Sequence, residues 1–187
     1  ALVEIYGHEV TRFPNVIDDL DILRETLNDA SKNHDCIITS GGVSMGDRDY
    51  VRILMEQEGE IVFWRVKMRP GSPPIFGTWQ GTPIFGLPGN PVAVMVTFFI
   101  FVLPAIRRMV GNIRYLNRKL KFPLITSIKK KKGRTEFRRG RLVSANEDIF
   151  VKVQENQGSG ILRSMSEADC LVILEHDEQN YEAGDKV

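Results

Sequence analysis

The sequence is poor in the residues that cross-link a fold or bind a metal, because its 187 residues include only two cysteines and three histidines. Cys36 and Cys170 are far apart, and each lies in an apolar stretch, where a cysteine is usually a buried free thiol. Neither a disulfide framework nor a metal knuckle is therefore expected, and a reducing compartment is favoured. The histidines show no metal-ligand spacing, and no nucleophile–base pair is evident in the sequence.

Long hydrophobic runs are also missing. The longest apolar stretch, residues 92–103, is followed by Pro104 and then by two arginines. A membrane-spanning helix needs about 20 apolar residues, so we expect a buried core helix here and no membrane partner. The first residues have no signal-peptide pattern. They resemble the end of a helix that stops at Gly7, which indicates a fragment of a longer protein.

The composition is that of an ordinary globular protein, with 42% hydrophobic residues, 26% charged residues and a net charge of +1. The balance of charge changes near residue 117: residues 1–116 carry 11 Lys/Arg against 13 Asp/Glu, and residues 117–187 carry 14 against 11. The secondary-structure pattern changes at the same place. We therefore predict an α/β domain over residues 1–113 and a small β domain over residues 117–187, with a linker near residues 112–119.

The first part of the chain alternates between strand-like and helix-like patterns. A strand-like segment at residues 8–13 and short runs rich in apolar residues at 36–39, 61–66, 74–77 and 83–86 predict strands. Helical spacing predicts one helix with Asp18 as its N-cap, a second over residues 50–58 and a third that begins at Pro91 and that Asn90 can cap. This alternation predicts a doubly wound, mostly parallel sheet.

The second part has no helical periodicity. Its short β-type segments lie at residues 120–125, 141–144, 149–153 and 170–175, separated by Gly, Asn and Asp. This spacing predicts a small all-β domain, either a barrel or a sandwich.

Two glycine-rich loops each follow a predicted strand and precede a predicted helix. Their candidate ligand-binding residues are Ser40, Gly41, Gly42, Ser44, Pro88, Gly89, Asn90 and Pro91. In open α/β sheets, ligands bind beyond the carboxyl ends of the strands, and amides at a helix N-terminus suit a phosphate. Either loop alone could be a plain strand-to-helix turn, but two in one domain favour an anionic, phosphorylated ligand.

Charged residues surround these loops. If the strand at residues 61–66 continues, it places Arg65, Lys67 and Arg69 on one face. We expect this row of three cations to bind an anion. The alternative is that the three side chains only line a solvent-exposed edge of the sheet. Asp18 and Asp49 could face the same crevice. Carboxylates beside an anion are costly unless a divalent cation such as Mg²⁺ bridges them to phosphate oxygens. The alternative is that both aspartates only cap helices.

The C-terminal part has a strongly basic segment, because residues 129–141 hold eight Lys/Arg and one Glu. Nucleic-acid binding is one interpretation. Only Phe137 interleaves with the basic residues, so a hairpin with a solvated lysine turn is the alternative, and we expect no nucleic-acid partner. Residues 157–160 form a second polar loop that could present amides and a hydroxyl group.

Several segments occur in an order that resembles a known family. The segments at residues 40–50 (SGGVSMGDRDY), 67–71 (KMRPG) and 87–92 (LPGNPV) resemble those of the molybdenum insertases, the molybdopterin molybdenumtransferases of the MoeA and gephyrin E-domain family. The match continues at residues 137–140, 157–159 and 163–166, so it covers essentially the whole chain. No single segment is specific, but their combination is.

The resemblance implies both a fold and a function. It implies a molybdopterin-binding α/β domain similar to MogA, followed by a C-terminal β domain. The family inserts molybdenum from molybdate into adenylylated molybdopterin in a Mg²⁺-dependent step that releases AMP. A cytoplasmic homodimer is implied, with the molybdopterin adenylyltransferase as a further possible partner. An adenylyltransferase-like enzyme and a non-catalytic binding or scaffold module of the same fold remain as alternatives.

The resemblance also assigns roles to individual residues. It places Asp18 and Asp49 at the metal and in catalysis, and it puts Arg65 and Arg69 where the family usually has lysines. It assigns Arg139 and Ser159 to molybdate or substrate binding. Lys67, which lies between the two arginines, is a further candidate binding residue whose role stays open.

Three departures from the family pattern bear on these roles. Arginine is not geometrically equivalent to lysine, and Ser72 replaces a common lysine. The family's two N-terminal domains, together with the first strand and helix of the α/β domain, are not in this sequence. Because a partner subunit's N-terminal domain completes the family's site, we expect this chain alone to turn over poorly.

Overall fold

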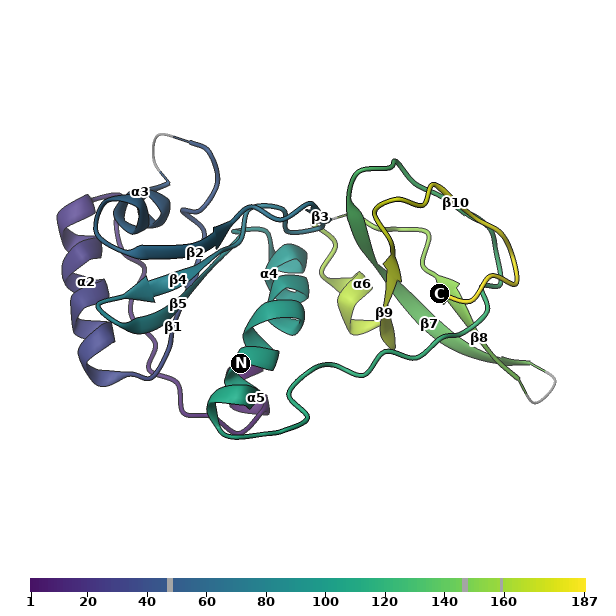
Figure 1. Ribbon diagram of the computed structural model, residues 1–187, viewed down its shortest axis with the longest axis horizontal. Helices are drawn as coiled ribbons and strands as arrows, with labels where there is room; N and C mark the ends of the chain where they lie inside the picture. The colour runs from purple at the N-terminus through teal and green to yellow at the C-terminus, as the bar shows by residue number, and fades with distance from the viewer. Residues whose placement is uncertain (47–48, 146–147, 159) are drawn as a thin grey trace. The chain divides into compact units, whose positions relative to one another are not determined.

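The computed structural model describes residues 1–46, 49–145, 148–158 and 160–187 (Figure 1). The chain forms two compact units. The first comprises Ala1–Arg65, Pro73–Gly89 and Thr97–Tyr115, and the second comprises Val66–Ser72, Asn90–Val96 and Leu116–Val187. Two short segments from the first half of the sequence therefore group with the C-terminal residues.

The first unit contains a four-stranded sheet in the order β1-β5-β4-β2. Its strands are β1 (Ile37–Ser40), β2 (Glu60–Trp64), β4 (Ile75–Trp79) and β5 (Thr82–Leu87). β1 and β5 are parallel, whereas β4 is antiparallel to both of its neighbours. Gln80 and Gly81 both have positive φ and form the tight turn that reverses the chain between β4 and β5. The predicted α/β class is confirmed, and the sheet, which was expected to be mostly parallel, is mixed: one of the pairs between its described strands is parallel and two are antiparallel.

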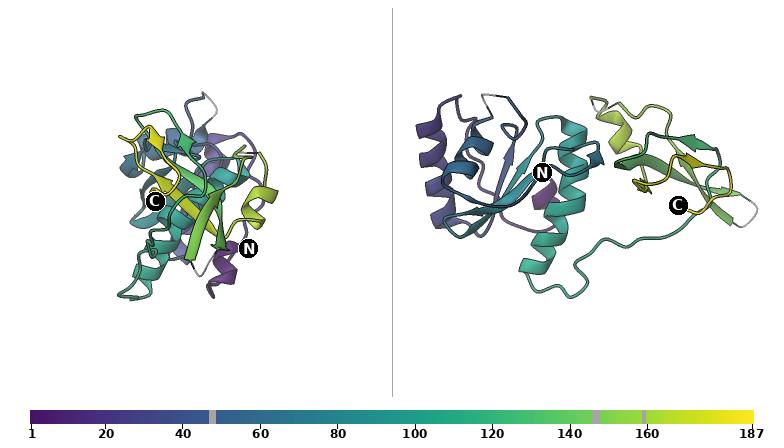
Figure 2. Two further views of the ribbon diagram at one scale, coloured as in Figure 1. Left: turned by 90° about the vertical axis from the view of Figure 1, so that its right-hand side faces the viewer. Right: turned by 45° about the horizontal axis from the view of Figure 1, so that its top comes forward.

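Helices cover both faces of this sheet. The unit's helices are α1 (Leu2–Ile5), α2 (Leu20–Asn33), α3 (Tyr50–Gln57), η1 (Phe98–Val102) and α5 (Leu103–Met109). α2 and α3 lie on one face, while η1 and α5 lie on the other (Figures 1 and 2). Leu27 of α2 and Leu54 of α3 belong to a buried cluster with sheet residues such as Ile84.

The apolar stretch that the sequence marked as a core helix is continuous in the structure. α4 (Pro91–Thr97), η1 and α5 follow one another without a break, and the π-helical turn lies just before Pro104. A proline leaves a carbonyl four residues earlier without its usual donor, and a π turn accommodates that loss. By length and composition alone this helix could cross a bilayer, but half of its apolar window is buried in the protein, as in a core helix.

The second unit is mostly β-structure around one long strand. Its elements are β3 (Met68–Arg69), β6 (Ile128–Lys129), β7 (Thr135–Ala145), β8 (Asp148–Val153), α6 (Arg163–Ser166), β9 (Cys170–Leu174) and β10 (Asn180–Tyr181). β7 pairs with β3 in parallel and with β8 and β9 in antiparallel fashion, and β6 pairs with β10. The small β domain is confirmed, and in its described residues the two sheets do not join into a closed ring.

Several predicted elements differ from the structure. Residues 8–13 form no strand, because no neighbouring segment pairs with them in the described residues. Asp19, and not Asp18, is the N-cap of α2: its side chain accepts hydrogen bonds from the amides of Asp21 and Ile22. Residues 120–125 contribute only isolated bridges, from Pro123 and Leu124.

Candidate functional site

The two glycine-rich loops leave the sheet side by side. Ser40, the last residue of β1, is in register with Leu87, the last residue of β5. Because these strands are parallel, both loops begin at the carboxyl edge of the sheet, where ligands bind in open α/β folds. The amide of Gly41 donates a hydrogen bond to the carbonyl oxygen of Leu87 at 2.9 Å. The structure therefore brings together the start of the first loop and Pro88 and Gly89 of the second.

Backbone conformation shapes the first loop. Gly41 and Gly42 have φ of +91° and +69°, a region that side-chain-bearing residues rarely adopt. A Cβ on Gly42 would lie 3.2 Å from Cγ2 of Val51, whereas a Cβ on Gly41 would meet nothing within 4 Å. Both positions therefore need glycine for conformation, and the space beside Gly41 is open to a ligand.

The second loop leads directly into a capped helix. The Oδ1 atom of Asn90 accepts hydrogen bonds from the amide of Val92 at 3.2 Å and from that of Ala93 at 3.5 Å. Pro91 is the first residue of α4. The sequence predicted both the cap and the helix start. The amide of Val94 donates to the carbonyl oxygen of Asn90, and Pro91 has no amide hydrogen, so this end offers an anion only the positive end of the helix dipole.

Asp49 closes the first loop instead of capping its helix. It occupies the N-cap position of α3, but its side chain makes no capping bond. Its Oδ2 atom accepts the amide of Gly46 at 2.5 Å, and the carbonyl oxygen of Gly46 accepts the amide of Asp49 at 3.1 Å. Ser44 is exposed in the same loop, and Asp47 lies outside the described residues. The carboxylate of Asp49 is thus held at the mouth of the loop.

The donor set limits what metal the first unit can hold. Asp18 is exposed in the segment before α2. Within the residues that the structure describes, no group of three or more His, Cys, Asp or Glu side chains could hold a metal ion. One or two carboxylates suit a Mg²⁺ ion whose other ligands are phosphate oxygens and water, and they do not suit an all-protein cage.

Trp64 supports the first loop from the end of β2. Its Nε1–H donates to the carbonyl oxygen of Val43 at 3.1 Å. The guanidinium groups of Arg52 and Arg65 lie 5.5 Å and 5.6 Å from the centre of its ring, within the range of a cation–π contact. Sequence reasoning missed the roles of Trp64 and Arg52. A tryptophan at a strand end indicates that its N–H needs an acceptor, but the spacing does not reveal which one.

The three cations at residues 65–69 do not form one row. β2 ends at Trp64, and Arg65 has φ of 67°, so the strand does not continue as the predicted shared face required. Arg65 belongs to the first unit, whereas Lys67 and Arg69 belong to the second. There the carbonyl oxygen of Lys67 accepts the amide of Thr135, and Arg69 pairs in register with Glu136.

Arg139 of β7 is buried, with 1% of its surface exposed. Its Nε–H donates to Oγ of Ser164 at 3.1 Å, and its Nη2 group donates to the carbonyl oxygens of Gly158 at 3.1 Å and Asn156 at 3.5 Å. Burial, together with the nearby charge of Arg69, lowers its pKa. Ser159 lies outside the described residues. Arg139 therefore anchors the loop that leads to Ser159.

Gln157 locks the same loop onto β7. Its Oε1 atom accepts the amide of Arg139 and its Nε2 group donates to the carbonyl oxygen of Arg139, both at 3.0 Å. The sequence singled out the loop at residues 157–160 but not these bonds or those of Ser164. No local pattern could have found them, because the partners lie 18 and 25 residues from Arg139 along the chain.

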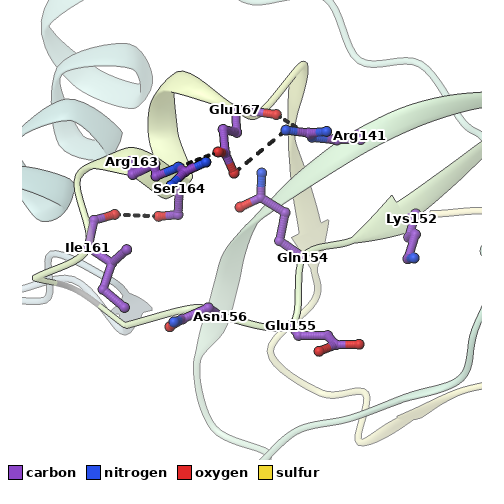
Figure 3. A pocket seen from close by; sticks show the side chains of 9 residues that line it. All are labelled: Arg141, Lys152, Gln154, Glu155, Asn156, Ile161, Arg163, Ser164 and Glu167. Atoms are coloured by element: carbon purple, nitrogen blue, oxygen red, sulfur yellow. Dashed lines mark hydrogen bonds and ion pairs between the residues drawn. The ribbon is translucent and has the colours of Figure 1, made fainter.

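A cavity of about 430 Å³ lies next to this loop in the second unit (Figure 3). Asn156 and Ser164 contribute to its wall, and Glu167 lies between Arg141 and Arg163 (Figure 3). Nε of Arg163 is 2.5 Å from Oε1 of Glu167, and Nη2 of Arg141 is 3.6 Å from Oε2. Glu167 therefore offsets these two positive charges, and the cavity offers an anion less than its arginine content suggests.

Comparison with known proteins identifies both parts of the chain. Residues 1–108 match the family model described as "Probable molybdopterin binding domain", and residues 121–187 match the "MoeA C-terminal region (domain IV)". The molybdopterin molybdenumtransferase of Haemophilus influenzae is 35% identical over 162 residues, which cover 84% of this chain and 40% of that protein. Gephyrin of Dictyostelium discoideum is 37% identical over 194 residues, which cover 91% of this chain and 27% of that protein.

A solved structure agrees with these matches. The crystal structure of the molybdopterin biosynthesis MoeA protein from Pyrococcus horikoshii matches 100% of this chain and 42% of its own, with a TM-score of 0.74 and 28% identity. The chain spans less than half the length of each of these relatives. The resemblance drawn from the sequence motifs is confirmed. The chain belongs to the family of the probable molybdopterin binding domain, continued by the MoeA C-terminal region (domain IV).

Proposed function

We propose that the full protein acts in molybdenum cofactor biosynthesis as a molybdopterin molybdenumtransferase. In this reaction it takes adenylylated molybdopterin and molybdate as substrates, transfers molybdenum to the dithiolene and releases AMP. The observation that carries the proposal is the pair of glycine-rich loops at the ends of the parallel strands β1 and β5. They lie in the part of the chain that matches the molybdopterin binding family.

The two loops are suited to bind the phosphate groups of the pterin. Main-chain amides near Gly41 and Gly42 can donate to phosphate oxygens, and the positive end of the α4 dipole favours their negative charge. The positive φ of both glycines lets the ligand approach the backbone closely. In this proposal Ser40, Ser44, Pro88, Gly89, Asn90 and Pro91 complete that wall of the site.

Asp49 and Asp18 would hold Mg²⁺ together with the phosphate oxygens of the substrate. The hydrogen bond from Gly46 fixes the Asp49 carboxylate at the loop mouth. The bound ion would supply charge neutralisation at the phosphoanhydride that is hydrolysed. Arg65, held over the ring of Trp64, would provide a further positive charge to the phosphates.

The second unit is suited to bind the oxyanion molybdate. Arg139 is buried, its hydrogen bonds within the described chain go to neutral oxygens, and the neighbouring charge that affects it is that of Arg69. A buried positive charge with a second one nearby is costly unless an anion lies beside it. Lys67 and Ser159 would complete this anion site.

The proposal includes a homodimer in the cytoplasm, with the partner subunit completing the site, and supply of the substrate by the molybdopterin adenylyltransferase. The match of residues 121–187 to the MoeA C-terminal region favours this activity over that of an adenylyltransferase-like enzyme. A non-catalytic scaffold of the same fold predicts substrate binding without release of AMP.

The test is AMP release by the full-length protein from adenylylated molybdopterin, with molybdate and Mg²⁺ present. We expect Asp49→Asn to lower the rate by about 10²-fold, as for the loss of one preorganised electrostatic group. Asp29→Asn is the matched control, because Asp29 is exposed on α2 and away from both loops. Arg69→Ala should weaken molybdate binding. Wild-type rates in Asp49→Asn, or unchanged molybdate binding in Arg69→Ala, would contradict these assignments.

A further inference from the structure

A second pocket in the C-terminal unit is strongly basic, and apart from Arg69 its residues play no part in the proposed function. Its volume is about 440 Å³. One carboxylate, that of Glu136, lines it together with six cationic side chains: Arg69, Lys129, Lys130, Lys131, Arg134 and Arg138. The lysine run that the sequence left open between a nucleic-acid site and a solvated turn thus forms a wall of a concave site.

The single carboxylate is already used by the protein. Glu136 is 4% exposed, and its Oε2 atom accepts hydrogen bonds from Nε and Nη2 of Arg138 at 3.0 Å and 2.9 Å. Its Oε1 atom lies 3.5 Å from the Nε atom of Arg134. That nitrogen atom is buried and has no hydrogen-bond partner in the described structure. One negative charge shared by two arginines leaves the pocket with a large excess of positive charge.

The lysine turn is held in place by its own backbone. The amides of Lys130 and Gly133 donate to the carbonyl oxygens of Gln179 and His176, each at 2.9 Å. Lys130 is 6% exposed, and its Nζ donates to the carbonyl oxygens of Arg134 at 3.0 Å and Lys131 at 3.3 Å. Lys130 therefore stabilises the turn, and Lys129 and Lys131 on either side of it remain exposed at the pocket. A preorganised cationic wall binds an anion at a lower entropic cost than flexible lysines do.

The pocket is separate from the loop that Arg139 anchors. Successive residues of a strand point to opposite faces, so Arg138 and Arg139 project to opposite sides of β7. Arg138 bonds to Glu136 and to the carbonyl oxygen of Lys129, whereas Arg139 bonds to the loop at residues 156–158. Arg69 is the one pocket residue that the proposed function also uses.

We propose that this pocket binds a compact anion that carries two or more phosphate groups. The cations come from several segments and surround one cavity, so they suit several linked negative charges better than a single oxyanion. No aromatic side chain lines the pocket in the part of the chain that the structure describes. Nucleic-acid grooves usually combine cations with stacking aromatics, so a long nucleic acid fits this pocket poorly.

The test is calorimetric titration of the full chain with pyrophosphate, orthophosphate and a single-stranded hexanucleotide, at low and at physiological ionic strength. We expect pyrophosphate to bind more tightly than orthophosphate, with an affinity that falls as salt rises. The double variant Lys129→Ala/Lys131→Ala should bind pyrophosphate at least about tenfold more weakly, since two charge-assisted hydrogen bonds are lost.

The control is Lys132→Ala, which removes an exposed lysine of the same run that does not line the pocket. It should retain the wild-type affinity for pyrophosphate. Both changes are at exposed residues, and circular dichroism is the check that the variants are folded. Equal losses in the control and the double variant would overturn the proposal. So would tighter binding of the hexanucleotide than of pyrophosphate.

Discussion

The two units hold their candidate site residues by different physical means. In the first unit, the loops after β1 and β5 depend on backbone geometry: Gly41 and Gly42 have positive φ, and the amide of Gly41 bonds to Leu87. In the second unit, the loop next to β7 depends on side-chain hydrogen bonds, chiefly those of the buried Arg139 and the partly buried Gln157. The first site therefore depends on which backbone conformations its residues allow, and the second depends on a hydrogen-bond network.

This difference explains why the sequence predicts more of the first site than of the second. Glycine, proline and asparagine have strong positional meaning, so the first site is visible in a few consecutive residues. A network of arginine, glutamine and serine can be built at many spacings, and its members acquire a role only when the fold brings them together. The comparison predicts that substitutions in the two units will act through different mechanisms.

The largest effect is expected for Arg139→Ala in the second unit. The substitution leaves the carbonyl oxygens of residues 156 and 158 and the hydroxyl of Ser164 without their donor and removes a buried side chain. We expect a loss of about 3 kcal/mol or more in the stability of that unit. Both tryptophans, Trp64 and Trp79, lie in the first unit, so the measurement is hydrogen exchange at the amides of β7.

Arg141→Ala is the control for that experiment. Arg141 is also on β7, but its side chain is 53% exposed and its ion pair with Glu167 spans 3.6 Å. An exposed ion pair of this kind contributes about 1 kcal/mol or less to the free energy of unfolding. Similar loss of protection in both variants would show that the buried network is not what holds the second unit's loop.

A smaller effect is expected for Gly42→Ala in the first unit. Alanine at φ of +69° is strained, and its Cβ would press on Val51 at 3.2 Å. We expect a loss of about 2 kcal/mol, against about 1 kcal/mol for Gly41→Ala, which has the strain but no close contact. Tryptophan fluorescence during urea unfolding measures both. Equal losses would mean that conformation alone, without the packing against Val51, determines the cost.

The smallest effect concerns the partly buried thiol of Cys36 in the first unit. Burial, with a further contribution from the charge of Asp35, raises the pKa of Cys36 to about 12. Because the folded-state pKa lies above the unfolded value, the stabilisation is complete below the unfolded pKa and is lost as pH rises towards about 12. We expect the first unit to lose about 1 kcal/mol between about pH 9 and pH 10. Urea unfolding at several pH values gives the free energy of unfolding of wild type and Cys36→Ala. We expect this free energy to fall more steeply with pH in the wild type, and identical slopes would rule out the thiol as the cause.

The sequence predicted most of the elements that form the first site. The strand over residues 36–39, the helix start at Pro91 and the Asn90 cap follow from local patterns and are confirmed. The helix cap at Asp18 and the strand at residues 8–13 were wrong. Two neighbouring aspartates have equal capping propensity, and a strand exists only if another segment supplies its hydrogen bonds.

The shared face expected for Arg65, Lys67 and Arg69 failed for a related reason. Alternation along a strand holds only while the strand continues, and Arg65 adopts a left-handed conformation that ends it. The residue types at positions 64–66 do not indicate that the strand ends there, because arginine has no preference for positive φ. The metal and substrate roles of the site residues stay predictions.

Local chemistry in the sequence determined the α/β class, the two glycine-rich loops and the family motifs, since these depend on residues near one another in the chain. Only the tertiary structure decided that Gly41 meets Leu87, that Trp64 supports the first loop and that Arg139 is buried against the loop at residues 156–158. It also decided that the lysines at residues 129–131 border a pocket that Glu136 lines. The physical reason is that burial and long-range hydrogen bonds depend on which segments the fold places side by side, and residue spacing does not carry that information.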